Sequence, residues 1–201
     1  MKTIFPKIFL LITTIGFSQQ SEFRMKIRAT QDKTGKRFEL RVNKTKQEVQ
    51  FHFAQYDSTS SKWDTKDKYL YNKLIKNFYK NGGMPYEHTR IIEGINRKYE
   101  YYKKDSISIP LNHPFIYVTD SIVLSTSERL KNFEVNKKTQ MKSGSQVTLN
   151  IFSNDTLRTV SVRSPTFKSH PLIYKLLTGM LEIYRNRNPK ILLTEKETFG
   201  Y

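Results

Sequence analysis

Three glutamates, Glu87, Glu93 and Glu100, lie within fourteen residues of one another and are the residues best placed for acid–base chemistry. His88 lies among them, and a run of tyrosines follows. Two carboxyl groups held about 5 to 10 Å apart can cleave a glycosidic bond, one as the acid and the other as the base or nucleophile. Glutamates in a segment this rich in lysine and arginine more often form surface ion pairs. A glycan hydrolase that uses paired carboxylates is therefore the alternative function and not the first.

The remaining residue types with catalytic potential form no recognisable motif. The four histidines, His52, His88, His113 and His170, are scattered and include no His-x-His or His-Glu-x-x-His pattern. Cysteine is absent, so the chain has no thiol nucleophile and no disulfide framework. It contains no Gly-x-Ser-x-Gly elbow and no phosphate-binding glycine loop. The sequence therefore predicts no catalytic residue, no metal site and no cofactor.

Tyrosines and cations are interleaved over residues 97–104. Flat aromatic rings stack on sugars or bases, and neighbouring cations can hold a phosphate or carboxylate group. In a strand, Tyr99 and Tyr101 would share one face and Tyr102 the other, so one of these faces could instead pack in the core. The candidate binding residues are Tyr99, Tyr101, Tyr102, Arg97, Lys98, Lys103 and Lys104.

Five of the seven aspartates are followed by serine or threonine. Aspartate in this position often opens a turn, because its carboxylate accepts hydrogen bonds from backbone amides just ahead. In four of the five pairs the next residue is Thr, Ile or Leu. This pattern resembles the acceptor motif of the periplasmic O-glycosylation system of one large group of Gram-negative bacteria. The resemblance implies a modification and no activity, with Ser58, Ser106, Ser121 and Thr156 as the candidate acceptors.

The chain is strongly basic, with 35 lysines and arginines against 18 acidic residues and a formal net charge of +17. The charge falls to +15 once Lys2 and Lys7 are removed with the N-terminal segment. Such a charge attracts polyanions, although a lysine-rich composition can also serve solubility alone. The cations are spread along the chain. The expected function is non-catalytic binding at the bacterial cell envelope to an anionic glycan, a lipid headgroup or a protein. We expect an acidic polysaccharide or an envelope protein as the partner, and we do not expect nucleic acid.

The first eighteen residues have the layout of a secretory signal peptide. Lys2 and Lys7 provide the basic start, residues 8–17 the apolar run, and Gly16 and Ser18 the small residues before the cleavage site. The apolar run is too short to span a bilayer, and no later stretch is apolar enough to do so. An exported chain without cysteine fits a bacterial envelope. We expect a soluble mature chain in the periplasm, on the cell surface or secreted.

Two segments repeat the order hairpin then helix, at residues 37–83 and 146–188. In the first, apolar and polar residues alternate over 38–42 and again over 49–53, on the two sides of a polar turn. Residues 65–81 carry two rows of apolar residues at helical spacing. Asp64 or Thr65 can cap that helix, and Gly82 can end it. In the second, apolar and polar residues alternate over 147–151 and again over 160–162, and a predicted helix begins at Pro171. The pattern is compatible with an internal duplication.

Short strands are predicted between these units, at Ile91-Ile92, residues 99–102, 106–111, 115–118 and 121–124. Residues 126–146 are expected to form a long loop, and Ile191-Leu192-Leu193 a last strand. The predicted organisation is a signal peptide at 1–18, a polar segment at 19–35 and one domain at 36–201. Strands dominate and the helices come singly, so the fold class is α+β, a mainly antiparallel sheet with two amphipathic helices packed on it.

Overall fold

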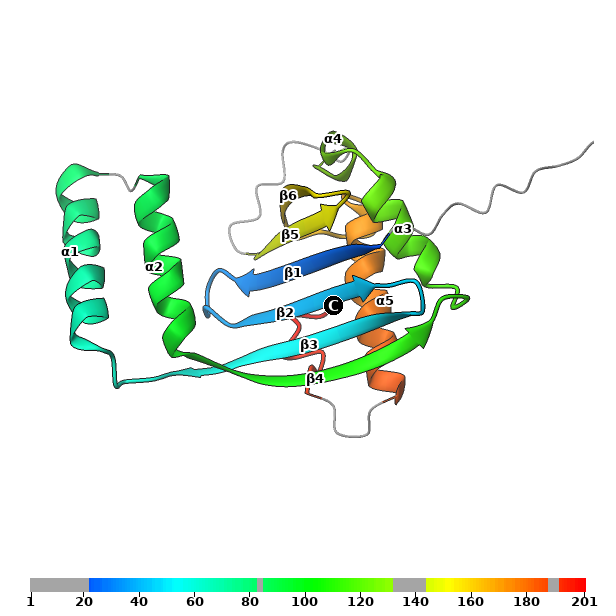
Figure 1. Ribbon diagram of the computed structural model, residues 1–201, viewed down its shortest axis with the longest axis horizontal. Coiled ribbons are helices and arrows are strands. Elements are labelled where there is room, and N and C mark those ends of the chain that lie inside the picture. Colours follow the sequence, from blue (N-terminus) through cyan, green and yellow to red (C-terminus); the bar gives the residue numbers. More distant parts are fainter. Residues whose placement is uncertain (1–21, 83–84, 132–143, 188–191) are drawn as a thin grey trace, which may run out of the picture.

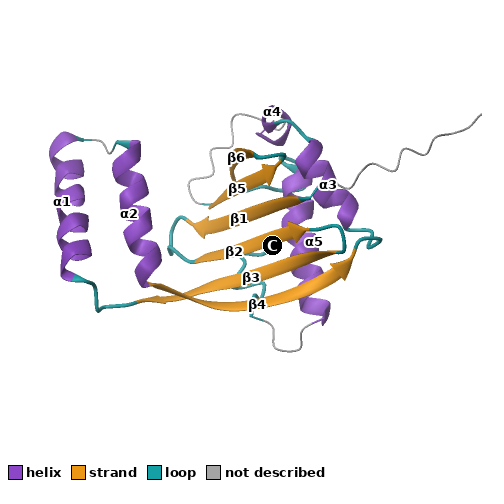
Figure 2. Cartoon of the chain, viewed as in Figure 1, coloured by secondary structure: helices purple, strands orange, loops and turns teal. Residues whose placement is uncertain are grey.

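One antiparallel sheet of six strands, in the order β4-β3-β2-β1-β5-β6, organises the chain. The computed structural model describes residues 22–82, 85–131, 144–187 and 192–201, so the predicted signal peptide lies outside the described residues. The elements, shown in Figures 1 and 2, are β1 (Phe23–Gln31), β2 (Arg37–Lys44), β3 (Glu48–Thr59), α1 (Thr65–Asn81), α2 (Tyr86–Tyr99), β4 (Glu100–Pro110), α3 (Ile116–Leu124), α4 (Ser127–Lys131), β5 (Ser145–Ser153), β6 (Thr156–Arg163) and α5 (Pro171–Arg187). The predicted α+β class and the antiparallel sheet are confirmed.

Both predicted hairpins form. In β2 and β3 the register pairs Leu40 with Phe53 and Val42 with Phe51, so the alternating apolar residues share one face. The hairpin of β5 and β6 turns through Asn154 and Asp155, which both have positive φ, at 48° and 57°. Two consecutive left-handed residues form the kind of two-residue turn that matches the twist of a hairpin, and Asn and Asp tolerate this conformation better than most residues.

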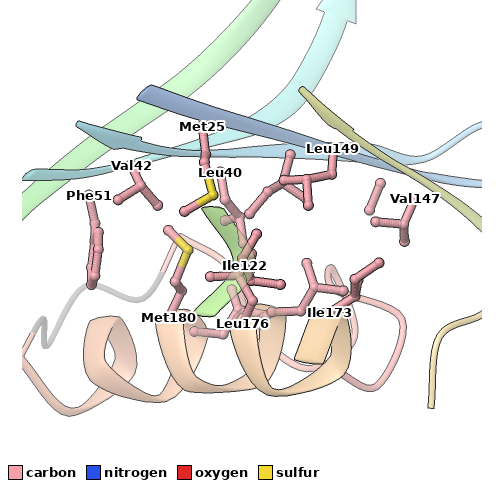
Figure 3. Close-up of a cluster of buried hydrophobic side chains, with 14 of the residues drawn as sticks. Met25, Leu40, Val42, Phe51, Ile122, Val147, Leu149, Ile173, Leu176 and Met180 are labelled. Atoms are coloured by element: carbon pink, nitrogen blue, oxygen red, sulfur yellow. The ribbon is translucent and has the colours of Figure 1, made fainter. Parts of the chain in front are cut away.

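The core lies between one face of the sheet and helices α3 and α5 (Figure 3). Met25, Leu40 and Leu149 from three strands point toward Ile173 and Leu176 of α5. The Tyr184 ring stacks on Phe53 with the ring centroids 4.1 Å apart. A helix laid across an antiparallel sheet buries one face of each, which leaves the second face of the sheet to polar side chains.

Residues 23–31, which we expected to lie in a polar segment before the domain, form β1 instead, between β2 and β5. Phe23, Met25, Ile27 and Ala29 are buried, and the residues between them include three cations. A strand with one open face carries a charged residue at every second position, and this lowers the average hydrophobicity of the segment. The boundary predicted at residue 36 is therefore wrong.

The helices also differ from the prediction. Helix α5 packs on the sheet as expected, but α1 packs on α2 and projects beyond the sheet (Figure 1). Both predicted ends of α1 are correct: the Asp64 carboxylate accepts hydrogen bonds from the amides of Lys66 and Asp67, and Gly82 ends the helix with a φ of 66°. The two hairpin-then-helix units consequently place their helices differently.

Three predicted strands are helical. Ile91-Ile92 lies in α2, where Ile91 and Ile95 are one helical turn apart. Residues 116–118 and 121–124 form the start and end of α3, with Phe115 as its N-cap, and the buried residues Ile116, Thr119 and Ile122 recur every third position. Asp120-Ser121, where the two predicted strands 115–118 and 121–124 would separate, lies inside that helix. The apolar runs were too short for their spacing to separate helix from strand.

The predicted long loop and the last strand are corrected in part. Residues 127–131 form α4 and residues 145–146 belong to β5, while 132–143 lie outside the described residues. Leu192 and Leu193 form a bend and not a strand, and Ile191 is not described.

Candidate functional site

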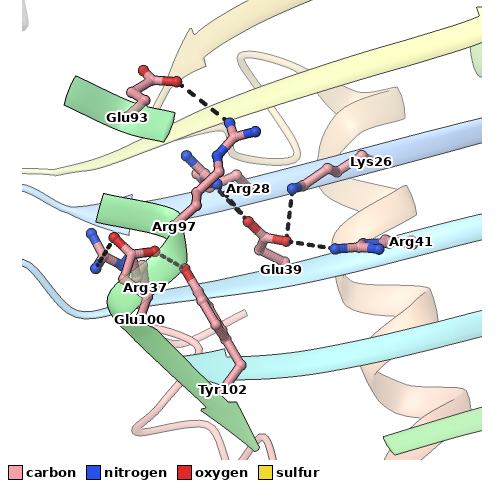
Figure 4. Close-up of polar contacts among 9 residues, drawn as sticks. All are labelled: Lys26, Arg28, Arg37, Glu39, Arg41, Glu93, Arg97, Glu100 and Tyr102. Atoms are coloured by element: carbon pink, nitrogen blue, oxygen red, sulfur yellow. Dashed lines mark hydrogen bonds and ion pairs between the residues drawn. The ribbon is translucent and has the colours of Figure 1, made fainter. Parts of the chain in front are cut away.

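The face of the sheet opposite the core is open and carries mainly polar and charged side chains (Figure 4). We call it the open sheet face. It contains a depression of about 830 Å³. Its lining from this face consists of Arg24, Lys26, Glu39, Arg41, Asn43, His52, Ala54, Lys104, Ser106, Asn150, Phe152 and Leu157. All six strands contribute to this lining, because residues in register on adjacent strands point to the same side.

Glu39 is the centre of a charged cluster on this face. Its carboxylate accepts two hydrogen bonds from Arg28, at 3.0 and 2.7 Å, and forms ion pairs with Lys26 at 2.9 Å and Arg41 at 3.4 Å. The side chain of Glu39 is only 6% exposed, whereas that of Arg41 is 52% exposed. Three cations surround one carboxylate, so the cluster keeps an excess of positive charge.

The environment of Glu39 fixes its ionisation. Burial alone would raise its pKa, but the hydrogen bonds and charges of Lys26 and Arg28 outweigh burial and lower the pKa to about 2. Burial also lowers the pKa of Lys26, more than the contact with Glu39 raises it. At neutral pH Glu39 is therefore an anion that holds the cations in place and has no proton to donate.

Polar and aromatic groups border the cations. The side chains of Asn43 and His52 lie 3.2 Å apart, and Asn150 accepts a hydrogen bond from Thr159 at 2.9 Å. The Arg24 guanidinium lies over the Phe152 ring, 5.0 Å from its centroid. Amide, imidazole and hydroxyl groups can exchange hydrogen bonds with a hydroxyl-rich ligand, while the arginines attract its negative charge.

A second cluster lies beside the first, around Arg37. Arg37 forms an ion pair with Glu100 at 2.7 Å and lies 4.2 Å from the centroid of the Tyr56 ring. Its Nε is buried and, among the described residues, has no hydrogen-bond partner. The Tyr102 hydroxyl donates to Glu100 at 2.8 Å, and burial together with this hydrogen bond raises the pKa of Tyr102 to about 12. Figure 4 shows the Glu100 carboxylate in contact with both Arg37 and Tyr102.

No protein-family model, no curated protein and no solved structure matches this chain.

The proposed function consequently rests on the chemistry of the described residues. Within the described ranges, no three His, Asp or Glu side chains are grouped so that they could hold a metal ion. The same part of the chain contains no helix of the length and apolarity that a membrane crossing requires.

The seven candidate binding residues do not form one site. Tyr99 stacks on Trp63, with the ring centroids 4.8 Å apart, at the base of the helix pair α1–α2. Tyr102 belongs to the Arg37 cluster. Three of the cations are paired: Arg97 with Glu93, Lys98 with Asp67 and Lys103 with Asp57. Tyr101 is 58% exposed, and only Lys104 lines the depression.

The three glutamates considered for acid–base chemistry are also separated from the depression. Glu87 is exposed in the first turn of α2. Glu93 pairs with Arg97, and Glu100 pairs with Arg37 and Tyr102. Asp105 does line the depression, but its carboxylate accepts hydrogen bonds from the Tyr184 hydroxyl and from the backbone amide of Ser106.

The five aspartates of the Asp-Ser/Thr pairs have different structural roles. Asp64 caps α1 and Asp155 lies in the β5–β6 turn, as the turn interpretation predicts. Asp57 pairs with Lys103, and Asp120 accepts two hydrogen bonds from the buried Lys44 at 2.6 and 2.8 Å. Asp57 and Asp105 lie in strands and Asp120 in a helix, so the turn interpretation is wrong for these three.

The candidate acceptors are exposed to different degrees. Ser58, Ser106 and Thr156 are exposed, whereas Ser121 is half-buried in α3. We expected Ser58 in a loop and Ser106 and Ser121 at strand entrances. Instead, Ser58 lies near the end of β3, Ser106 within β4 and Ser121 inside a helix. Thr156 follows a hairpin turn as expected.

The open sheet face was missed at the sequence level. Its signal is the alternation of Arg24, Lys26 and Arg28 with apolar residues, followed by Glu39 and Arg41 at the same spacing. Finding it required recognising residues 23–31 as a strand and placing that strand beside β2.

Proposed function

We propose that this chain is an exported basic protein of a bacterial cell envelope that binds an anionic glycan on its open sheet face without chemical conversion. The observation that carries the proposal is the cationic lining of the depression. Arg24, Lys26, Arg41 and Lys104 line it, while Glu39 is enclosed by cations and Asp105 is bonded to Tyr184. A concave surface with excess positive charge raises the local concentration of a polyanion.

The shape and the uncharged groups favour a glycan over a compact anion. The depression is open and extends over several strands, which suits an extended chain lying across the sheet. Asn43, His52 and Asn150 can hydrogen-bond sugar hydroxyls, and Phe152 at one border can contact a sugar ring.

A binding role is also favoured by the ionisation of the acids. Glycoside hydrolysis requires one carboxylic acid that is protonated at the working pH. Glu39 has a pKa of about 2 and is an anion at neutral pH. Within the described part of the chain, no pair of free carboxylates faces the depression, so no observation there favours the hydrolase.

Binding of polygalacturonate, a polymer of acidic sugars, tests the proposal. We expect binding at about 0.02 M salt that weakens steeply toward 0.15 M, where the screening length falls to about 8 Å. The triple variant Arg24→Gln, Arg41→Gln and Lys104→Gln removes three exposed cations that line the depression and do not face the core. Its affinity should fall by about tenfold or more, since three exposed charge contacts of up to about 1 kcal/mol each are lost.

A matched control removes the same charge elsewhere. Lys46, Lys168 and Lys196 are exposed and lie outside the depression. The triple variant of these three residues to Gln should bind polygalacturonate almost as well as the wild type. Equal losses in both triple variants would mean that net charge alone drives binding, and absence of binding at low salt would overturn the proposal.

A further inference from the structure

The helices α1 and α2 form a pair that stands apart from the sheet. α1 is the outermost element at one end of the long axis of the molecule, and α2 lies between it and the sheet (Figure 1). The two helices are connected to the sheet through the ends of β3 and β4. One broad side of α1 therefore faces away from every other element in the described structure.

The base of this pair is firmly held. The rings of Trp63 and Tyr99 stack with an interplanar angle of 7°. The Tyr99 hydroxyl donates to the Asp67 carboxylate at 2.8 Å and accepts from the amide of Asp64 at 2.9 Å. Lys98 pairs with the same Asp67 at 3.0 Å. These contacts join the first turn of α1 to the last turn of α2, so the pair projects from the sheet as a defined unit.

The pair also exposes an unusual share of apolar surface. Ten large hydrophobic side chains are exposed among the described residues, and five of them lie on α1 and α2: Tyr69, Leu70, Phe78, Tyr79 and Ile91. Tyr69 and Tyr79 are 69% and 79% exposed. α1 packs on α2, and Leu74 is the buried hydrophobic residue of α1. At 100° per residue both tyrosines point away from Leu74, and so both lie on the outer side of α1.

The outer side of α1 carries cations beside these tyrosines. Helical spacing places Lys73, Lys76 and Lys80 between and next to Tyr69 and Tyr79. α1 contains five lysines and one aspartate, and that aspartate is already paired with Lys98. Over residues 62–98 there are nine cations and four acids. Two copies of this surface would repel each other, so its charge favours an anionic partner over self-association.

We propose that the outer side of α1 docks on the surface of an anionic lipid bilayer. A basic helix with aromatic residues on its exposed side is suited to the interface, where lysines approach phosphate groups and tyrosine rings lie at headgroup depth. A hydrated acidic polymer would use the lysines but would give Tyr69 and Tyr79 little apolar contact. The surface differs from the open sheet face, and the inference does not rest on the proposed glycan binding.

Sedimentation with vesicles tests this inference. Full-length protein is mixed with vesicles of phosphatidylcholine alone or with about a third of phosphatidylglycerol, at low salt. The N-terminal apolar segment is common to all variants, so differences between variants report the helix pair. We expect Lys73→Gln, Lys76→Gln and Lys80→Gln together to lower partitioning onto the anionic vesicles by about tenfold or more. Tyr69→Ser with Tyr79→Ser should lower it by several-fold while the charge stays unchanged.

Controls separate this surface from general charge and from the sheet face. The triple variants of Lys46, Lys168 and Lys196, and of Arg24, Arg41 and Lys104, should retain most of the anionic-vesicle binding. Circular dichroism should show that all variants keep their helix content. Equal binding by every variant, or loss that depends on the lysines but never on the tyrosines, would overturn bilayer docking, and concentration-dependent dimers would instead identify a second copy as the occupant.

Discussion

At the scale of single residues, Glu39 links ionisation to folding. Its pKa is about 2 in the folded protein against an ordinary value of 4.5, so the folded state favours the anion. A lowered folded pKa contributes stability that is fully present above pH 4.5 and is lost as the pH falls toward 2. From the size of this difference we expect about 3 kcal/mol of the free energy of unfolding to disappear across that window. Urea unfolding at a series of pH values measures it.

The variant Glu39→Gln isolates this contribution from that of other acids. It leaves Lys26 and Arg28 without their shared anion, so stability at pH 7 should fall by roughly 2 to 4 kcal/mol. The difference between wild type and variant should then shrink as the pH approaches 2. A constant difference from pH 7 to pH 2 would contradict the assigned role.

The candidate acceptors in the Asp-Ser/Thr pairs give a second prediction at this scale. If they are glycan acceptors, protein from its native host is heavier than its sequence mass. Ser58→Ala, Ser106→Ala and Thr156→Ala should each remove mass, because these hydroxyls are exposed. Ser121→Ala should remove less mass or none, because Ser121 is half-buried inside a helix and is less accessible to a transferase. Intact-mass spectrometry decides, and a native mass equal to the sequence mass would leave these aspartates as structural residues only.

At the scale of elements, a substitution at the base of the α1–α2 pair should destabilise these two helices and leave the sheet stable. Tyr99→Ala removes the stack on Trp63 and both hydrogen bonds of the hydroxyl. Trp63 is the only tryptophan, so its fluorescence should shift to the red as water reaches the ring. Amide hydrogen exchange in α1 and α2 should accelerate, while β1, β2 and β5 keep their protection.

Tyr99→Phe is the matched control because it keeps the aromatic stack and loses only the hydroxyl. It should shift the fluorescence less and accelerate amide exchange in α1 and α2 less than Tyr99→Ala does. If exchange in the central strands accelerates as much as in the helices, the pair unfolds with the sheet and is not an independent element.

Elements with a strong periodic signal could be predicted from the sequence, and elements defined by their neighbours could not. The β2–β3 and β5–β6 hairpins, the ends of α1 and the placement of α5 follow from alternation, caps and apolar doublets. β1 was missed because its cations face an open side that only the assembled sheet creates. α3 was misread because its short apolar runs fit either period. The proposed binding surface joins residues from all six strands, so no local motif marks it.

At the scale of the whole molecule, the proposal of export predicts a processed N-terminus. Mass spectrometry of the native protein should find a chain that begins at Gln19 or close to it, since Gly16 and Ser18 fit the small-residue positions. Processing there would leave the first residue of β1, Phe23, intact. Recovery of a chain that still begins with Met1 would argue against export.

The interior position of β1 has a consequence for how the chain reaches its fold. β1 pairs with β2 across a short turn but also with β5, so that Ile27 meets Leu149 more than a hundred residues later. Contacts between residues so distant in sequence raise the contact order and slow folding, because the entropy cost of closing a large loop comes before the stabilising contacts form. The sheet therefore cannot be completed until the C-terminal third of the chain is present. A chain that folds only after its synthesis is complete would meet this requirement. An N-terminal fragment without β5 would leave one edge of β1 unpaired and prone to aggregation.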